Sequence, residues 1–194
     1  MALSDNELIQ EFNNGTEQAF AELIERYQHR VYNTTFRMLG NREDALDIAQ
    51  ESFIRVYKNL KKFKGDSSFS TWLFRITTNA CRDELRKRKR RPAIYTGTSS
   101  DDENNTIQNI SSDIDEPEKT TISRDINKTI QEKIKQLPAE QKLIFVLREF
   151  QDLSYQEIAD ILHISMGTVK SRLSRARRSL RQDLNKIIKN GGLE

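Results

Sequence analysis

Apolar side chains recur at the three- or four-residue spacing of a helix through most of the chain. The clearest stripe runs from Phe20 to Met38, and Gly15 and Gly40 bound it. The same spacing, with capping residues between the stripes, predicts helices over residues 4–14, 16–39, 42–62 and 71–90. No segment alternates convincingly as a strand does, and no internal repeat is visible, so the pattern favours an all-α fold.

The helical pattern stops between residues 92 and 119. This segment is rich in Ser, Thr, Asn and Asp, and residues 96–120 carry seven Asp or Glu against Lys119. Such a composition buries too little apolar surface to fold, which predicts a flexible acidic linker. Helical spacing then resumes. The fold class is therefore all-α, with two small helical domains, residues 1–91 and 120–194, joined by the linker over residues 92–119.

The second domain contains two helical segments joined by a very short connection. Ser154 with Glu157 forms a capping box ahead of a short helix, and Ser165 can cap a longer helix over about residues 166–188. Many motifs of this kind have glycine at the turn; here it is His163, which can adopt the left-handed conformation at modest cost. This arrangement predicts a helix-turn-helix whose second helix is free to enter a major groove.

The outward face of that second helix is basic and polar. Its N-terminal half is the part that reaches base edges in this motif, and Lys and Arg bind guanine edges or phosphates. The alternative is an ordinary amphipathic helix whose basic face is solvated. The residues that we expect to contact duplex DNA are Thr168, Lys170, Ser171, Arg172, Ser174, Arg175 and Arg178.

The net charge of +3 says little about partners, but the placement of charge says more. Residues 82–91 carry seven Lys or Arg against Asp83 and Glu84, and residues 165–190 carry eight against Asp183. Two basic blocks on either side of an acidic segment suggest two contacts with a polyanion. The alternative is a pair of solvated helix faces.

Aromatic side chains stand close to Lys and Arg just ahead of the first basic block. Phe69 and Trp72 fall in a segment that also holds Lys64 and Arg75. Exposed aromatics beside cations suit unstacked bases better than a closed duplex, and Asn79 offers both a donor and an acceptor to a captured base. The alternative is that the aromatics are core residues, which is favoured for Trp72 and left open for Phe69.

Several classes of function lack their residues. Cys81 is the only cysteine, and His29 and His163 match no metal-ligand spacing, so we expect no disulfide, metal or other cofactor. The longest apolar run, Leu143–Leu147, is too short to span a bilayer, and residues 1–10 lack the apolar core of a signal peptide. We expect a cytoplasmic protein without membrane insertion, small-molecule substrate or enzymatic activity.

Two short runs are highly specific: Asp-Ile-Ala-Gln-Glu at residues 47–51 and Phe-Ser-Thr-Trp-Leu at residues 69–73. With residues 19–23, 137–138, 153–159 and 167–176, they resemble the extracytoplasmic-function (ECF) sigma factors of bacterial RNA polymerase over nearly the whole chain. The resemblance implies a transcription factor that binds core RNA polymerase and directs promoter-specific initiation. It also implies an anti-sigma partner and a stress-response regulon.

The resemblance assigns roles to both domains. The helix with Asp47, Gln50, Glu51 and Arg55 corresponds to the one that grips the clamp helices of the polymerase's largest subunit. Without the family, this row would be taken as a solvated face. The second domain corresponds to the reader of the upstream (minus-thirty-five) element and to a partner of the flap of the second-largest subunit. In its helix-turn-helix, base contacts fall on Lys170, Ser171, Ser174 and Arg175, and phosphate contacts on Thr168, Arg172 and Arg178.

The loop at residues 64–71 and the helix after it correspond to the part that opens and reads the downstream (minus-ten) element. A pocket for a flipped base would cost a few kcal/mol of lost stacking, which phosphate contacts can offset. By analogy the pocket comprises Asn79 with Ser67, Phe69 and Ser70. The full set implied in minus-ten binding is Lys64, Ser67, Phe69, Ser70, Arg75, Asn79, Arg82, Arg86, Lys87 and Arg88.

In this family the two promoter elements lie roughly 85 Å apart, at ~34 Å per turn of DNA. A flexible linker as long as residues 92–119 typically spans about 30 Å, so a rigid partner must hold the domains. The acidic linker then either threads the positive interior of the polymerase or masks the basic blocks in the chain alone.

Two other functions remain open at the level of sequence. One is a stand-alone regulator that binds an operator as a dimer through its helix-turn-helix. The other is a metal-dependent nuclease, since Asp44, Asp47 and Glu51 share a helix face, although no histidine or lysine stands beside them with a recognisable spacing.

Overall fold

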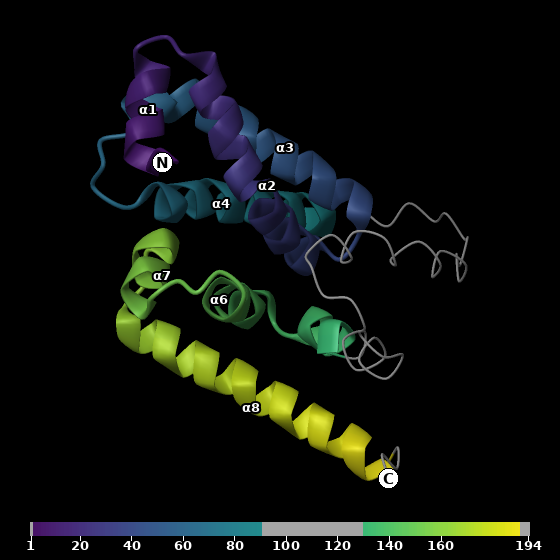
Figure 1. The fold of residues 1–194 in the computed structure, drawn as a ribbon. Coiled ribbons are helices and arrows are strands. Elements are labelled where there is room, and N and C mark those ends of the chain that lie inside the picture. The colour runs from purple at the N-terminus through teal and green to yellow at the C-terminus, as the bar shows by residue number, and fades with distance from the viewer. Residues whose placement is uncertain (1, 91–129, 191–194) are drawn as a thin grey trace.

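The computed structural model describes residues 2–90 and 130–190, and every regular element in these ranges is a helix (Figure 1). The N-terminal unit, residues 2–90, contains α1 (Asp5–Asn13), α2 (Glu17–Leu39), α3 (Arg42–Asn59), the short 3-10 helix η1 (Leu60–Lys62) and α4 (Phe69–Arg90). The C-terminal unit, residues 130–190, contains a helical segment over residues 130–136, then α6 (Ala139–Glu149), α7 (Tyr155–Leu162) and α8 (Met166–Asn190). The all-α prediction is confirmed, and the predicted linker falls outside the described residues.

Capping residues of the sequence set the helix boundaries in the N-terminal unit. Gly40 ends α2 with a φ of 85°, a left-handed conformation that glycine adopts without strain. Asn41 then accepts the Asp44 N–H at 2.8 Å and opens α3. At the next boundary, α4 begins at Phe69, earlier than the pattern predicted, because the Ser68 hydroxyl caps its first turn.

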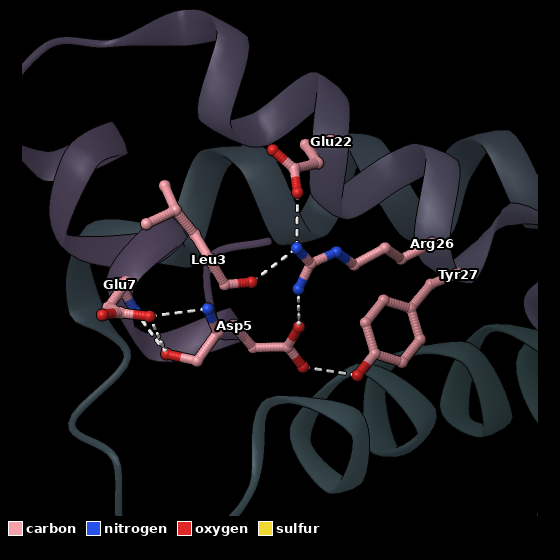
Figure 2. Close-up of polar contacts among 7 residues, drawn as sticks. Leu3, Asp5, Glu7, Glu22, Arg26 and Tyr27 are labelled. Atoms are coloured by element: carbon pink, nitrogen blue, oxygen red, sulfur yellow. Dashed lines mark hydrogen bonds and ion pairs between the residues drawn. The ribbon is translucent and has the colours of Figure 1, made fainter. Parts of the chain in front are cut away.

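A polar network anchors α1 to α2 (Figure 2). The carboxylate of Asp5 accepts hydrogen bonds from Arg26 Nη1 at 3.1 Å and from the Tyr27 hydroxyl at 2.5 Å. The same guanidinium donates to the Leu3 carbonyl at 2.5 Å and pairs with Glu22. Burial and the bond to Asp5 raise the pKa of Tyr27, so its hydroxyl stays protonated and remains a donor.

Each unit has an apolar core of its own. In the N-terminal unit the core lies between α1, α2, α3 and α4 and includes Leu8, Leu23 and Leu73. In the C-terminal unit the segment over residues 130–136 packs on α8, with Ile134 and Ala176 buried. These two cores agree with the two helical domains that the sequence predicts.

A third core joins the two units. It contains Phe74 and Cys81 of α4, Ile144 of α6, and Ile158 and Ile161 of α7, all at most 1% exposed. Figure 1 shows α6 and α7 between the N-terminal helices and the long α8, in agreement with the contacts of α6 to α2 and of α7 to α4. The sequence did not predict this shared core, because a hydropathy pattern identifies an apolar face but not the face that covers it.

Candidate nucleic-acid and partner interfaces

The helix-turn-helix has the local geometry that the sequence predicts. The Ser154 hydroxyl accepts the Glu157 N–H at 3.2 Å, and the Glu157 carboxylate accepts the Ser154 N–H at 2.8 Å, which completes the capping box of α7. His163 ends α7 in the left-handed region, with φ 53° and ψ 48°. The Ser165 hydroxyl then accepts the Thr168 N–H at 3.1 Å and caps α8. These contacts make the turn tight and fix the start of the second helix.

The basic face of α8 is open to solvent over most of its length. The exposed members of the predicted set are Lys170, Ser171, Ser174, Arg175 and Arg178. Thr168 and Arg172 are half-buried, and Arg172 Nη1 pairs with Glu140 of α6 at 2.8 Å. The first turn of α8 carries no acidic residue, so the positive end of its dipole is available to an anion such as a phosphate.

One apolar residue at this surface was missed by the sequence analysis. Met166, the first residue of α8, is 43% exposed next to the candidate base-contacting residues. An apolar side chain at this position can contact a thymine methyl group in the major groove. Its place at the first position of the second helix was the signal available in the sequence.

The outward side of α3 carries the predicted partner residues. Asp47 and Gln50 are exposed, whereas Glu51 and Arg55 are half-buried and form an ion pair at 2.6 Å. All four belong to the same helix and recur at three- or four-residue spacing, so they form one continuous surface. The structure thus brings together the residues that the resemblance implies.

Apolar side chains that the sequence analysis did not assign lie on the same side of α3. Leu46 and Ile54 are each 46% exposed, and Tyr57 is 44% exposed. Ile54 follows Asp47 by two helical turns, which places both on one face. Large exposed apolar side chains beside polar ones are typical of a protein-binding surface rather than a solvated face.

The loop over residues 64–68 is closed at its base by aromatic rings. Phe63 and Phe69 flank the loop with ring centroids 6.2 Å apart and planes at 89°, and Trp72 packs against both. Tyr27 of α2 lies edge-on to Phe69 at 5.4 Å. Phe69 is only 2% exposed, and Trp72 is half-buried. In this structure Phe69 is therefore a core residue rather than an exposed platform for a base.

The rest of the candidate base pocket is accessible. Lys64, Ser67 and Asn79 are exposed, and Ser70 is half-buried. Phe69 therefore supports the loop from below in this conformation, while polar side chains form its surface. A pocket that places Phe69 against a base requires this ring to move.

The predicted cations of α4 differ in their surroundings. Arg86 and Lys87 are exposed, and Arg75 and Arg82 are half-buried on the same helix. Arg82 Nη2 reaches Glu140 of the C-terminal unit at 3.1 Å.

Arg88 has more bonding partners than the other predicted cations of α4. It pairs with Glu84 at 3.3 Å and with Asp44, and donates to the Leu39 carbonyl at 3.2 Å. Arg88 therefore ties α4 to α2 and α3, and its phosphate contact stays a prediction.

Neither a candidate metal cluster nor a candidate membrane span occurs among the described residues. In the ranges 2–90 and 130–190 no group of three or more His, Cys, Asp or Glu could hold a metal ion, and this includes Asp44, Asp47 and Glu51. Over the same ranges, no helix has the length and apolar character needed to cross a membrane.

Comparison with known families identifies two matching segments. Residues 23–91 match the model of sigma-70 region 2, and residues 128–180 match the model of sigma-70 region 4. The first segment covers α3, the loop and α4, and the second covers α6, α7 and the N-terminal part of α8. The two matched segments thus contain all three candidate surfaces.

Curated relatives match over nearly their full length. The chain is 38% identical over 179 residues to the ECF RNA polymerase sigma factor SigW of Bacillus subtilis, covering 92% of this chain and 96% of that protein. It is 36% identical over 185 residues to the RNA polymerase sigma-H factor of Pseudomonas aeruginosa, covering 95% and 96%. The ECF RNA polymerase sigma-E factor of Escherichia coli is 34% identical over 187 residues, with 96% and 97% covered.

Solved structures share the fold at lower identity. The structure of CnrH in complex with the cytosolic domain of CnrY matches with a TM-score of 0.67 at 23% identity, covering 94% of this chain and 97% of that chain. The sigma factor RpoE of Bartonella quintana, solved with the anti-sigma factor NepR, matches with a TM-score of 0.64 at 20% identity, covering 86% and 96%.

Proposed function

The chain belongs to the ECF group of the sigma-70 family, and we propose that its N-terminal and C-terminal units divide promoter recognition between them. It is a sigma factor, which binds core RNA polymerase and promoter DNA and directs promoter-specific transcription initiation. The proposed domains are residues 1–91 and 120–194, with residues 92–119 as the linker that lies outside the described residues.

The outward side of α3 is the proposed docking surface for the clamp helices of the largest polymerase subunit. The observation that carries this assignment is the combination of exposed Ile54 and Leu46 with Asp47 and Gln50 on one helix. Apolar anchors surrounded by polar residues give a protein interface both affinity and orientation. This surface lies outside both candidate DNA surfaces, so polymerase and DNA can bind together.

The remaining surfaces are proposed to bind promoter DNA. The loop over residues 64–68 and the cations of α4 bind the melted minus-ten element, with Asn79 reading a flipped base. The helix-turn-helix reads the minus-thirty-five element as duplex, and its unit contacts the flap of the second-largest subunit. Lys170, Ser171, Ser174 and Arg175 reach bases, whereas Thr168, Arg172 and Arg178 hold phosphates.

Three further assignments follow from the family. We propose an anti-sigma factor as a regulatory partner in a stress response. Support comes from the two structural neighbours, of which one was solved with the anti-sigma factor NepR and the other with the cytosolic domain of CnrY. We also propose a cytoplasmic location, where the chain can reach polymerase and chromosome, and no catalytic activity of its own, since polymerase supplies the chemistry.

The docking proposal is tested by measuring the affinity of variants of this chain for core polymerase. The variants Asp47→Ala and Ile54→Ala should each weaken binding to core polymerase by about tenfold or more, as expected for residues at the centre of an interface. His29→Ala, an exposed change on α2, is the matched control and should bind as wild type. Unchanged binding of both variants, with normal helicity, would refute α3 as the docking surface.

The two classes of contact on α8 are separated by salt dependence. With holoenzyme bound to an identified promoter, Arg178→Ala should weaken binding to all upstream sequences alike. It should also reduce the slope of log affinity against log salt concentration by about one, the value for one lost phosphate contact. Arg175→Ala should instead cost about 1–3 kcal/mol and relax the preference at one base pair. The reverse result would exchange the two assignments.

A further inference from the structure

Met166 is an exposed apolar side chain on the otherwise polar and basic face of α8. It is 43% exposed, although Val169, one helical turn later, is fully buried. Between residues 130 and 183, the part of the C-terminal unit whose side chains the structure describes, no other large hydrophobic residue is exposed to this degree. The described part of the chain therefore leaves this one apolar side chain uncovered.

Helix geometry places Met166 in one row with two residues that are proposed to reach bases. Lys170 and Ser174 follow it at intervals of four residues, and both are exposed, so the three side chains lie along one side of the helix. In a helix-turn-helix the N-terminal residues of the second helix contact base edges, and Met166 is the first residue of α8. The row predicts that Met166 meets a base pair beside the one that Lys170 contacts.

The first turn of α8 is fixed well enough to position a side chain. The Ser165 hydroxyl accepts the Thr168 N–H at 3.1 Å and lies 2.9 Å from the Thr168 hydroxyl. The Val169 N–H donates to the Ser165 carbonyl at 3.1 Å, and Leu173, only 1% exposed, anchors the next turn in the core. The backbone of Met166 is thus held in place, while its unbranched side chain can adapt to the surface that it meets.

The major groove of DNA offers such a side chain one apolar partner. Base edges there carry hydrogen-bond donors and acceptors, and the C5-methyl group of thymine is the apolar group among them. The thioether of Met166 donates no hydrogen bond and accepts only weakly, so it gains little from the polar edges. A protein partner fits less well, because the docking surface on α3 combines Leu46, Ile54 and Tyr57, whereas Met166 stands alone among cations and hydroxyls.

We infer that Met166 is a specificity-determining residue for the minus-thirty-five element, and that it packs against the methyl group of one thymine. The inference rests on the proposed function, because it takes α8 to lie in the major groove of this element. It adds an apolar contact to a set of residues that otherwise read the groove through hydrogen bonds and charge. Burial of one methyl group corresponds to about a three- to fivefold gain in affinity, which favours thymine at one position.

The contact is tested by removing the methyl group from the DNA and the side chain from the protein. In an identified promoter, each thymine of the upstream element, on either strand, is replaced in turn by deoxyuridine, which lacks only this methyl group. Binding of the wild-type holoenzyme should weaken about three- to fivefold at one position. Holoenzyme with Met166→Ala should bind the unsubstituted promoter more weakly by a similar factor, and deoxyuridine at that position should cause no further loss.

Two variants serve as controls for this cycle. Met166→Leu keeps an apolar side chain and should keep the sensitivity to deoxyuridine. Arg178→Ala removes a proposed phosphate contact and should weaken binding while leaving the deoxyuridine effect unchanged. Equal losses with deoxyuridine in the wild type and in Met166→Ala, or no loss at any thymine in the wild type, would overturn the inference.

Failure of the proposed function would give a different result. Replacing the whole upstream element by an unrelated sequence should weaken binding of the wild-type holoenzyme more than any single deoxyuridine does. If that replacement leaves binding unchanged, α8 does not read this element, and the proposed function and the inference are both wrong. If the element is required but no thymine depends on Met166, the inference alone is wrong.

Discussion

The hydroxyl of Thr71 donates a hydrogen bond of 2.9 Å to the carboxylate of Glu157. Thr71 lies in the first turn of α4, where its N–H and hydroxyl also contact Ser68 Oγ at 3.1 and 2.8 Å. Glu157 belongs to the capping box of α7. The bond therefore joins the base of the candidate minus-ten loop directly to the first helix of the helix-turn-helix.

The first prediction concerns the charge on Glu157. Burial alone would raise the pKa of this carboxyl, but hydrogen bonds from Ser154 and Thr71 outweigh it and lower the pKa below its ordinary value of 4.5. Thr71→Val removes one donor and should move the pKa of Glu157 back upward, as measured by its side-chain carboxyl shift in an NMR titration. An unmoved titration would show that the bond is absent in solution.

The same shift predicts the direction of a pH effect on stability. Because the folded pKa of Glu157 is depressed, the ionised group stabilises the fold fully above about pH 4.5, and this contribution is lost as the pH falls through the folded value. Glu157→Gln should flatten the acid side of the stability curve of the chain, measured by urea unfolding at several pH values. A curve identical to that of the wild type would contradict the assignment.

The second prediction concerns the turn of the helix-turn-helix. His163 has a φ of 53°, a conformation that costs a residue with a Cβ about 1–2 kcal/mol. His163→Gly should therefore be more stable than His163→Ala by ~1 kcal/mol, even though glycine is the more flexible in the unfolded chain. Thermal unfolding of the two variants measures the difference, and a more stable Ala variant would mean that the turn relaxes in solution.

The third prediction concerns the support of the minus-ten loop. Tyr27 is held by Asp5 and in turn packs edge-on against Phe69 (Figure 2 shows the bond to Asp5). Tyr27→Phe keeps the ring and removes only the bond to a charged group, so it should lower the unfolding free energy by about 1–2 kcal/mol. Gln28→Ala, exposed on the same helix, should change it by less than about 0.5 kcal/mol.

The fourth prediction concerns a buried charge at the contact between the two units. Burial lowers the pKa of Arg37 to about 10, and its Nε has no hydrogen-bond partner among the described residues. Arg37→Met keeps an apolar side chain against Phe150 and removes the buried charge, so it should raise the free energy of unfolding. Urea unfolding of the chain measures the change, and a less stable variant would contradict the prediction.

Local features of the fold could be read from the sequence, because they depend on residues close together in the chain. The capping box at Ser154 and the left-handed turn at His163 were both predicted correctly. The position of Phe69 was not, because its burial depends on Tyr27 of another helix. The shared core and the contacts of Glu140 with Arg82 and Arg172 were missed for the same reason. Both join segments that lie far apart in the sequence, where no local pattern reports the contact.

At the candidate surfaces, too, local spacing was informative, whereas features that depend on neighbouring helices were missed. Spacing placed Asp47, Gln50, Lys170 and Arg175 on exposed helix faces, and the structure confirms their exposure. The exposed Leu46 and Ile54 went unnoticed, because an apolar residue at helical spacing is assigned to a core until neighbouring helices are placed. The functional roles of all these surface residues stay predictions.

Run-off transcription shows whether this chain directs core polymerase to promoters. Core polymerase should produce transcripts with discrete start sites from a subset of genomic fragments only when this chain is added. Ile54→Asp should reduce these transcripts by about tenfold or more through weaker docking, while His29→Ala should not. No chain-dependent transcript from any fragment, together with full operator protection by the chain without polymerase, would contradict the account and favour a stand-alone regulator.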